Sequence, residues 1–289
     1  MEHILEAGYQ VAAVIGVVQE DELDDLTRKY SLPILYFDKL NTSATAEKLT
    51  AFNADLFILC GYNKILKNRI IKVPDLGTIN LHGGKLPEYR GAAPINWQII
   101  NGEETGGCSI IYVDEGIDTG DIIAQEIYPI TPGDTHASIL EKTLAIFPPL
   151  LEKVLKQIED GSVNAEKQDL NTGGYFPRRY PSDSLISWKK MDDVQVHNLV
   201  RGMFGPYPAA YTFLGDNKIE IDKTQLMDQT YAGTPGQVVD KKGESVIVQA
   251  SNRGILIERI SVDGRSVPPS DILKKGDLLK QMEQEEGKK

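Results

Sequence analysis

The chain has few of the residues that crosslink small secreted domains and no long hydrophobic segment. Its two cysteines, Cys60 and Cys108, each lie within an apolar run, so we expect two buried thiols and no disulfide. No apolar run reaches the roughly 18 residues that a transmembrane helix needs. No basic segment precedes an apolar stretch at the start, as it would in a secretory signal. We therefore expect a cytoplasmic protein that does not enter a membrane.

Two common kinds of binding site are also missing from the sequence. The chain has four histidines, scattered without the spacing of a metal site, so we predict no bound metal. It has no G-x-x-x-x-G-K-[ST] segment, which argues against a P-loop nucleotide site.

Lys and Arg are fewer than Asp and Glu, and the excess of acidic residues is not spread evenly along the chain. The formal net charge of the 289 residues is −11. Residues 1–205 contain 19 Lys and Arg against 29 Asp and Glu, a charge of −10, whereas residues 206–289 contain 12 against 13. Because affinity for nucleic acid comes largely from Lys and Arg contacts to phosphate, this composition weighs against an RNA or DNA partner.

Short β-branched runs alternate with helical patterns over the first 160 residues. This alternation predicts βαβ units, and hence an α/β domain with a mostly parallel sheet, which the family resemblance described below implies to be Rossmann-like. We expect the Pro148-Pro149 pair to bend or interrupt the last helix. The expected strands are 11–18, 33–37, 56–60, 78–82, 108–113 and 122–130, and the expected helices are 20–30, 43–53, 93–101 and about 135–160.

The pattern changes after residue 160, where polar and Pro/Gly-rich sequence leads to short alternating runs separated by glycines. Such runs predict a small β-barrel or sandwich, and the family resemblance described below implies that it is an OB-like barrel. We therefore divide the chain into a catalytic domain at 1–189, a connecting helix at 190–206, an OB-like domain at 207–280 and a solvated tail at 281–289.

The strand that usually opens a doubly wound sheet is absent. Residues 1–8 (MEHILEAG) instead look like the first helix, with Gly8 as its stop. Without that strand the sheet would lack a central member. Either the start codon is misplaced, the sequence has been trimmed, or the fold tolerates a gap, and we favour the first.

The candidate catalytic side chains lie at the end of one expected strand and in the loop that follows the next. Asn80 and His82 stand two residues apart at the end of strand 78–82, so their side chains point to the same face. The carboxyl ends of parallel strands are where α/β folds bind ligands. Glycines in the segment that follows let the backbone approach a ligand closely. The loop 114–121 (DEGIDTGD) follows the next expected strand and contains Asp118.

A carboxamide, an imidazole and a carboxylate at neighbouring strand ends suit acyl transfer to an amine. The first two can donate to an oxygen that becomes anionic, and the carboxylate can orient the imidazole and accept the proton that the amine loses. Taken singly, Asn80, His82 and Asp118 are more often turn or surface residues. The sequence on either side of these residues makes the catalytic interpretation the favoured one.

The segment N-x-H-x-x-x-L-P-x-Y-R-G-x-x-P-x-x-W from Asn80, followed by D-x-G-x-D-T-G-D from Asp114, resembles the 10-formyltetrahydrofolate-dependent formyltransferases. The resemblance continues through H-N-x-x-R-G (from His197) and PYPAAYTF, and it covers about residues 4–280. It implies that Asn80, His82 and Asp118 are the catalytic trio and that N10-formyltetrahydrofolate is the co-substrate. The folate would lie along Leu86, Pro87, Ile110, Asp114, Gly116 and Ile117.

Gly84 and Lys85 depart from the family pattern, which usually has Ser and Leu there. We expect the change to remove a hydroxyl near the folate and to add a cation.

The resemblance leaves the acceptor amine open. The family formylates methionyl-tRNA, nucleotide-linked amino sugars, glycinamide ribonucleotide and some peptide or ornithine amines. The glycinamide enzyme is a single shorter domain, so the expected barrel disfavours it. Methionyl-tRNA enzymes carry an inserted basic loop after the second strand, where this chain has the short, acidic QEDELDDLTRKY.

The segment FPRRYPSDSLISW favours a sugar substrate, because it resembles part of the UDP-4-amino-4-deoxy-L-arabinose formyltransferase. Its Arg178 and Arg179 either clamp a diphosphate or form a solvated linker pair, and we add Tyr89 and Arg90 as candidate substrate contacts. We favour an amino-sugar nucleotide N-formyltransferase, which in this family is often a homodimer. The alternatives are a methionyl-tRNA formyltransferase, a formyl-folate hydrolase and an inactive folate- or nucleotide-binding module.

Overall fold

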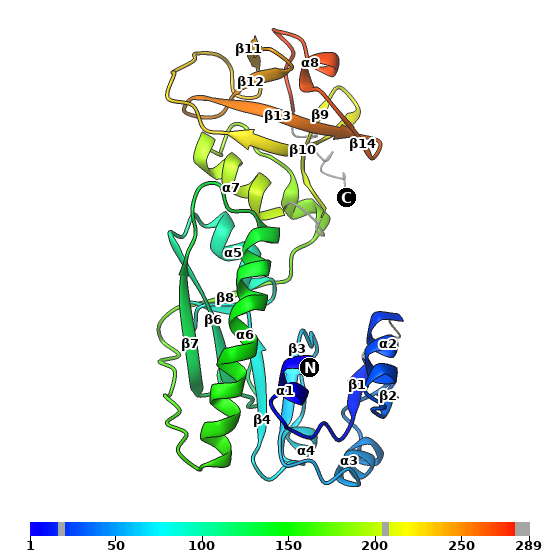
Figure 1. Ribbon diagram of the computed structural model, residues 1–289. Coiled ribbons are helices and arrows are strands. Elements are labelled where there is room, and N and C mark those ends of the chain that lie inside the picture. The colour runs from blue at the N-terminus through cyan, green and yellow to red at the C-terminus, as the bar shows by residue number, and fades with distance from the viewer. Residues whose placement is uncertain (17–20, 204–207, 281–289) are drawn as a thin grey trace, which may run out of the picture. The chain divides into compact units, whose positions relative to one another are not determined.

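The computed structural model describes residues 1–16, 21–203 and 208–280, so the predicted tail at 281–289 lies outside the described residues. The contacts divide the chain into two compact units, shown in Figure 1. The first contains residues 1–94, 107–128 and 142–177, and the second contains 95–106, 129–141 and 178–289. The second unit thus begins before the predicted border at 189 and takes in segments from earlier in the chain.

The first unit contains two sheets of the expected α/β kind. The larger sheet has the strand order β3-β4-β6-β7. β3 is parallel to β4, but β6 is antiparallel to β4, so the predicted mostly parallel sheet is mixed. The other sheet is a parallel pair, β1 with β2. The bounds are β1 Val14–Gly16, β2 Ile34–Tyr36, β3 Phe57–Cys60, β4 Thr78–His82, β6 Thr105–Tyr112 and β7 Ile122–Pro129.

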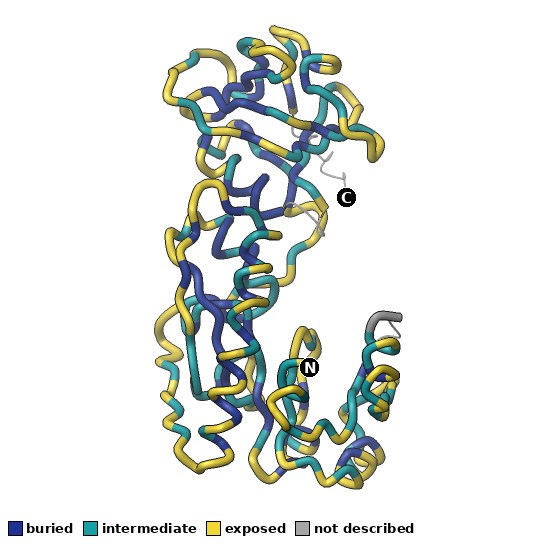
Figure 2. Tube along the Cα trace, viewed as in Figure 1, coloured by how far each residue is buried: buried dark blue, intermediate teal, exposed yellow. Residues whose placement is uncertain are grey.

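Among the described residues, no strand joins β1 to β3, and each of these strands pairs on one side only. This break agrees with the expectation that the sheet lacks a central member. The break also leaves apolar side chains incompletely buried. Ile58 of β3 is only half-buried, whereas Ile79 of β4 is fully buried. Figure 2 shows the same contrast, with buried residues following β4 and β6 and fewer along β1 and β2.

Helices of the first unit form where the sequence indicates. α3 begins after Thr42, whose hydroxyl accepts a hydrogen bond from the backbone N–H of Thr45, as expected for an N-cap. α6 runs through Pro148 and Pro149 without ending, so the predicted interruption does not occur. The helix bounds are α1 Glu2–Glu6, α2 Asp21–Lys29, α3 Ser43–Thr50, α4 Asn68–Ile71, α5 Pro94–Ile100 and α6 His136–Glu159, of which α5 and the start of α6 belong to the second unit.

A short parallel pair joins distant parts of the first unit. β5 (Tyr89–Gly91), which follows the Asn80/His82 strand, pairs with β8 (Gly174–Phe176). The rings of Tyr89 and Phe176 stack with centroids 4.8 Å apart. The loop after His82 is therefore tied to sequence more than 80 residues further along.

The described strands of the second unit form an antiparallel sheet in the order β11-β12-β13-β10-β9, with β14 paired to β13. No strand ladder among the described residues closes the predicted barrel. Instead, Leu278 and Lys280 make isolated bridges to Gln237 and Phe213 near its two end strands. The bounds are η1 Pro181–Ser184, α7 Asp193–Met203, β9 Ala210–Leu214, β10 Asn217–Gln225, β11 Val238–Lys242, β12 Ser245–Gln249, β13 Gly254–Val262, β14 Arg265–Val267 and α8 Pro269–Ile272.

The H-N-x-x-R-G segment of α7 has a structural role. Nε2 of His197 lies 3.0 Å from the backbone oxygen of Pro132, so it carries the proton, and Nδ1 accepts from the hydroxyl of Thr224 at 2.9 Å. Burial lowers the pKa of His197. Arg201 donates to the backbone oxygens of Thr131 and Asp134. These bonds fix α7 against the 131–134 turn.

Neither cysteine is in a disulfide, as expected. Cys108 is buried, but Cys60 is exposed at the end of β3, so the prediction of two buried thiols is wrong for Cys60. Within the part of the chain that the structure describes, no helix combines the length and apolarity needed to cross a bilayer.

Candidate active site

Strand β4 carries Asn80 and His82 on one face, as the sequence predicts. The antiparallel register places Ser109 of β6 opposite His82, so these side chains share that face. His82 is only 6% exposed. The half-buried carboxamide of Asn80 makes no hydrogen bond to any described residue, so its N–H donors are open to a ligand.

The imidazole of His82 is held through one nitrogen. Its Nε2 lies 2.7 Å from the backbone oxygen of Tyr89. A carbonyl oxygen can only accept, so Nε2 carries a proton and donates it there. Nδ1 then faces Asp118, with 3.6 Å between Nδ1 and Oδ1. The predicted pairing of His82 with Asp118 is present, and the bond to Tyr89 fixes which nitrogen is directed at the carboxylate.

Asp118 is positioned by its backbone as well as by its side chain. Its φ of +53° lies in the left-handed region, which non-glycine residues rarely adopt. Oδ2 accepts a hydrogen bond from the backbone N–H of Gly91 at 2.9 Å. Asp114 stabilises the same loop by accepting from the N–H of Gly116 and the hydroxyl of Thr119. The carboxylate therefore reaches His82 from a loop with a fixed conformation.

The segment after His82 is tightly packed. The Ser109 hydroxyl donates to the backbone oxygen of Gly84 at 2.9 Å, and Gln125 donates to the backbone oxygen of Leu86 at 2.9 Å. A Cβ added to Gly84 would lie 2.6 Å from Nε2 of His82, so this chain has no room there for the serine that the family usually has. Lys85, the other departure, forms an ion pair with Glu88 at 3.1 Å.

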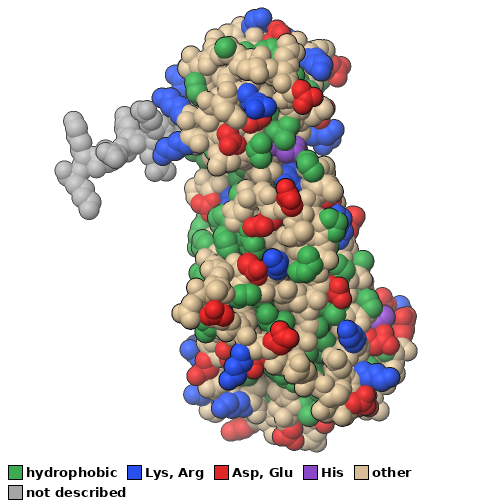
Figure 3. Space-filling view, turned by 90° about the vertical axis from the view of Figure 1, so that its left-hand side faces the viewer, with side chains coloured by type: hydrophobic (Ala, Val, Ile, Leu, Met, Phe, Trp, Pro, Cys, Tyr) green, Lys and Arg blue, Asp and Glu red, His purple; other side chains and the backbone are tan. Residues whose placement is uncertain are grey.

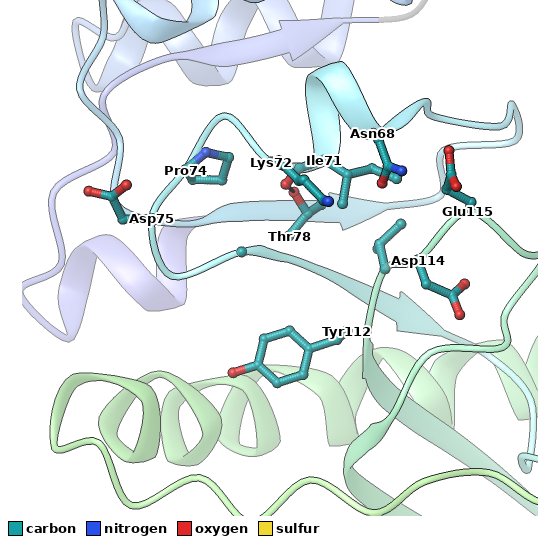
Figure 4. Close-up of a pocket in the computed structure, with 11 residues that line it drawn as sticks. Asn68, Ile71, Lys72, Pro74, Asp75, Thr78, Tyr112, Asp114 and Glu115 are labelled. Atoms are coloured by element: carbon teal, nitrogen blue, oxygen red, sulfur yellow. Dashed lines mark hydrogen bonds between the residues drawn. The ribbon is translucent and has the colours of Figure 1, made fainter.

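A pocket of 580 Å³ lies at the end of β4 away from His82, where Thr78 begins the strand. Its lining includes Tyr112, which pairs with Ile79 and so faces the other side of the sheet, and it includes none of Asn80, His82 and Asp118. Figure 4 shows Asn68 and Ile71 of α4, with Lys72 directly after the helix, on one side of the pocket and Asp114 and Glu115 at one end. The pocket therefore extends from the start of the Asp118 loop to α4.

The residues predicted to hold the folate occupy different environments. Asp114, Gly116 and Ile117 are exposed on the loop, with Ile117 39% exposed. Leu86 is 2% exposed and Pro87, joined to it by a cis peptide bond, is half-buried. Ile110 is fully buried and faces the opposite side of the sheet from Asn80 and His82, because it pairs with Leu81. This register contradicts the prediction that Ile110 lines the same pocket.

The residues predicted to bind the acceptor are mostly engaged in the protein. Tyr89 is buried in its stack on Phe176, and the Arg90 guanidinium donates to the backbone oxygen of Thr172 at 2.8 Å. In the second unit, Arg179 stacks on Trp97 with 4.6 Å from its guanidinium carbon to the ring centroid, and Arg178 is exposed. Of the four, only Arg178 is exposed to solvent.

Three polar residues that shape the site were not predicted. Ser109 and Gln125 hold the segment after His82, and Gln168 holds the Asp118 loop through its backbone oxygens. Gln168 lies in a polar segment with no periodic pattern, so the sequence gives no signal for it. Ser109 sits within an apolar strand, where a lone serine indicates a hydrogen bond but not its partner.

Comparison with known proteins agrees with this geometry. Residues 10–155 match the model of the formyl transferase family, and residues 179–276 match that of the formyl transferase C-terminal domain. The methionyl-tRNA formyltransferase of Geobacter sulfurreducens is 30% identical over 92% of this chain and 86% of its own length. The bifunctional polymyxin resistance protein ArnA of Wigglesworthia glossinidia brevipalpis is 31% identical over 82% of this chain and 37% of its own length.

Solved structures share the fold at lower identity. The sugar 3N-formyltransferase WlaRD superposes with a TM-score of 0.68 at 20% identity, covering 91% of this chain and 93% of its own. HypX from Aquifex aeolicus, in complex with tetrahydrofolic acid, gives a TM-score of 0.63 at 18% identity and covers 93% of this chain and 50% of its own. With its two family domains and its relatives over most of its length, this chain belongs to the formyltransferase family and is a folate-dependent N-formyltransferase.

Proposed function

We propose that this chain transfers the formyl group of N10-formyltetrahydrofolate to the amine of a nucleotide-linked amino sugar. The arrangement of Asn80, His82 and Asp118 supports the chemistry. The charge of −10 over residues 1–205 is the reason for choosing a sugar rather than a tRNA as acceptor, because negative charge weakens the binding of an RNA phosphate backbone.

In this proposal Asn80 and His82 stabilise the oxygen of the reacting formyl group. The open carboxamide of Asn80 donates to that oxygen as it gains negative charge. Because Nε2 of His82 is committed to Tyr89, Nδ1 is the ring nitrogen left for the reacting group. Tyr89 thus acts through its backbone, by setting the direction of the imidazole.

Asp118 accepts the proton that the acceptor amine loses. The acceptor nitrogen forms a bond to the formyl carbon and loses a proton, while the bond from that carbon to the folate nitrogen breaks and the folate nitrogen gains one. The Asp118 carboxylate, 3.6 Å from Nδ1 of His82, takes the first proton. The Gly91 N–H keeps the carboxylate directed at this point.

The surface around the first unit is consistent with a small acceptor. The segment that would hold a basic insertion in a methionyl-tRNA enzyme is instead the acidic helix α2. On the face shown in Figure 3, acidic and basic side chains are interspersed. One structural neighbour, the N-formyltransferase from Helicobacter canadensis, was solved with folinic acid and dTDP-3-aminofucose; it has a TM-score of 0.61 at 19% identity and covers 86% of this chain and 98% of its own.

A second candidate, methionyl-tRNA formylation, is favoured by one surface feature. Four exposed cations lie in α4 and on either side of it, and none of them forms an ion pair with a described carboxylate: Lys64, Lys67, Arg69 and Lys72. Several sequence relatives are methionyl-tRNA formyltransferases. These four cations are the place where this chain would contact a phosphate backbone.

A competition assay separates the two candidates. The chain is incubated with N10-formyltetrahydrofolate and either a panel of nucleotide-linked amino sugars or methionyl-tRNA, and products are identified by mass spectrometry. We expect formylated product with at least one sugar and none with the tRNA. Preferential formylation of the tRNA would overturn the proposal in favour of the second candidate. Location in the cytoplasm and a homodimer remain predictions, to be checked by fractionation and light scattering.

A further inference from the structure

Gln168 holds the catalytic loop through its backbone. Its Nε2 donates to the backbone oxygen of Asp118 at 2.8 Å and to that of Gly120 at 2.7 Å. Both partners can only accept, so the orientation of the amide is fixed. Its Oε1 is buried and has no hydrogen-bond partner among the described residues. One side chain therefore uses both of its donors on two carbonyls of this loop.

The loop needs such a restraint. Asp118 has a left-handed φ of +53°, a conformation that costs energy for a residue with a Cβ. Gly120 passes so close to β6 that an added Cβ would lie 1.8 Å from the backbone oxygen of Tyr112. Residues 114–117 of the same loop are exposed. Besides the hydrogen bonds to Asp114 at its start, contacts around Gly120 at its far end therefore hold its conformation.

Gln168 is itself anchored. Two residues earlier, Glu166 pairs with Ile122 at the start of β7, where each backbone N–H donates to the other residue's oxygen at 2.8 Å. The two ends of this arrangement, β7 and the Asp118 loop, belong to the same unit. Gln168 thus connects a strand of the sheet to the loop that carries the catalytic carboxylate.

We propose that Gln168 is a positioning residue for formyl transfer, which acts by keeping the Asp118 carboxylate in place beside His82. The inference rests on the proposed catalytic role of Asp118. Without the amide, two loop carbonyls lose their donors and the left-handed backbone at Asp118 is free to relax. A displacement of about 1 Å at a reacting group costs on the order of 10²-fold in rate.

The test compares Gln168→Met, which keeps the length of the side chain but removes both donors, with Gln225→Met at an exposed position of β10. We expect Gln168→Met to lower kcat about 10²-fold with little change in KM for either substrate. Amide hydrogen exchange in residues 114–121 should become faster, whereas Gln225→Met should change neither readout. Gln168→Asn, whose shorter side chain cannot span both carbonyls, should fall between the wild type and Gln168→Met and serves if the Met variant does not fold.

A double-mutant cycle with Asp118→Asn decides the mechanism. If Gln168 acts through Asp118, adding Gln168→Met to Asp118→Asn lowers kcat no further. Equal losses in both backgrounds, or wild-type kcat in Gln168→Met, would overturn the inference while leaving Asp118 catalytic. If Asp118→Asn alone keeps wild-type kcat, the proposed function of Asp118 fails, and the inference about Gln168 falls with it.

Discussion

Nδ1 of His82 lies 3.6 Å from Oδ1 of Asp118, while Nε2 of the same ring lies 2.7 Å from the backbone oxygen of Tyr89. The two contacts use opposite ends of the imidazole. One end is held by the backbone oxygen of Tyr89, so the other end is the one directed at the carboxylate. Asn80, on the same face of β4, adds a donor that has no partner in the described protein.

Removing any member of the trio should reduce formyl transfer by orders of magnitude. We expect Asn80→Ala to lower kcat about 10²–10³-fold, as for loss of one oxyanion donor. His82→Ala and Asp118→Ala should each cost about 10²–10⁴-fold. Folate binding, measured by fluorescence titration, should stay largely intact, and Asn217→Ala at an exposed position of β10 should be neutral. Wild-type turnover in the His82 variant would rule this mechanism out.

Restoring the family's serine at position 84 should harm this chain. A Cβ there would lie 2.6 Å from Nε2 of His82 and 2.6 Å from the backbone oxygen of Tyr89, and the backbone cannot yield cheaply. We expect Gly84→Ser to lower the free energy of unfolding by about 1–3 kcal/mol and to reduce kcat by displacing the imidazole. Urea denaturation and the formyl-transfer assay measure the two effects. Gly133→Ala is the matched control, since its added Cβ meets no atom closer than 4.0 Å; equal behaviour of the two variants would contradict the expectation.

The two thiols should react very differently. Burial raises the pKa of Cys108 to about 12, and the residue is fully buried in β6. Cys60 is exposed. At pH 8 we therefore expect an aromatic disulfide reagent to label one thiol per folded chain and two after denaturation. Cys60→Ser should abolish labelling of the folded chain, and rapid labelling of Cys108 in that variant would show that β6 opens.

Stability should fall in mild acid partly through His197. Burial is the main cause of its lowered pKa, so the folded state takes up its proton at a lower pH than the unfolded state, whose pKa is about 6.5. The stability associated with this group is present above about pH 6.5 and is lost as the pH falls through the folded pKa. Urea unfolding from pH 7.5 to 5.0 should show a smaller decline for His197→Gln than for the wild type. Parallel declines would indicate that other groups account for the whole effect.

The sequence predicted the positions of Asn80, His82 and Asp118 better than those of the residues around them. Asn80 and His82 were predictable because alternation along a short strand places them on one face, and Asp118 because its loop follows the next strand. Register was not predictable from the same pattern. Both faces of β6 are apolar, so nothing in the sequence showed that Ile110 would point away from His82.

Contacts between segments far apart in the chain could not be predicted from the sequence either. Tyr89 and Arg90 look like ligand contacts because they are a polar aromatic and a cation in a glycine-rich loop. In the fold, Phe176 and Thr172 engage their side chains. The break between β1 and β3, in contrast, was expected from the helical pattern at residues 1–8.

The pairing of β5 with β8 affects where the chain can be divided. The family's N-terminal segment ends at residue 155, yet Glu166, Gln168 and Phe176 complete the first unit. A fragment cut at 155 would leave the edge of β5 and the carbonyls of the Asp118 loop exposed to water. An expressed catalytic fragment should therefore extend at least to Phe176, and a nascent chain cannot complete this site until that residue has left the ribosome.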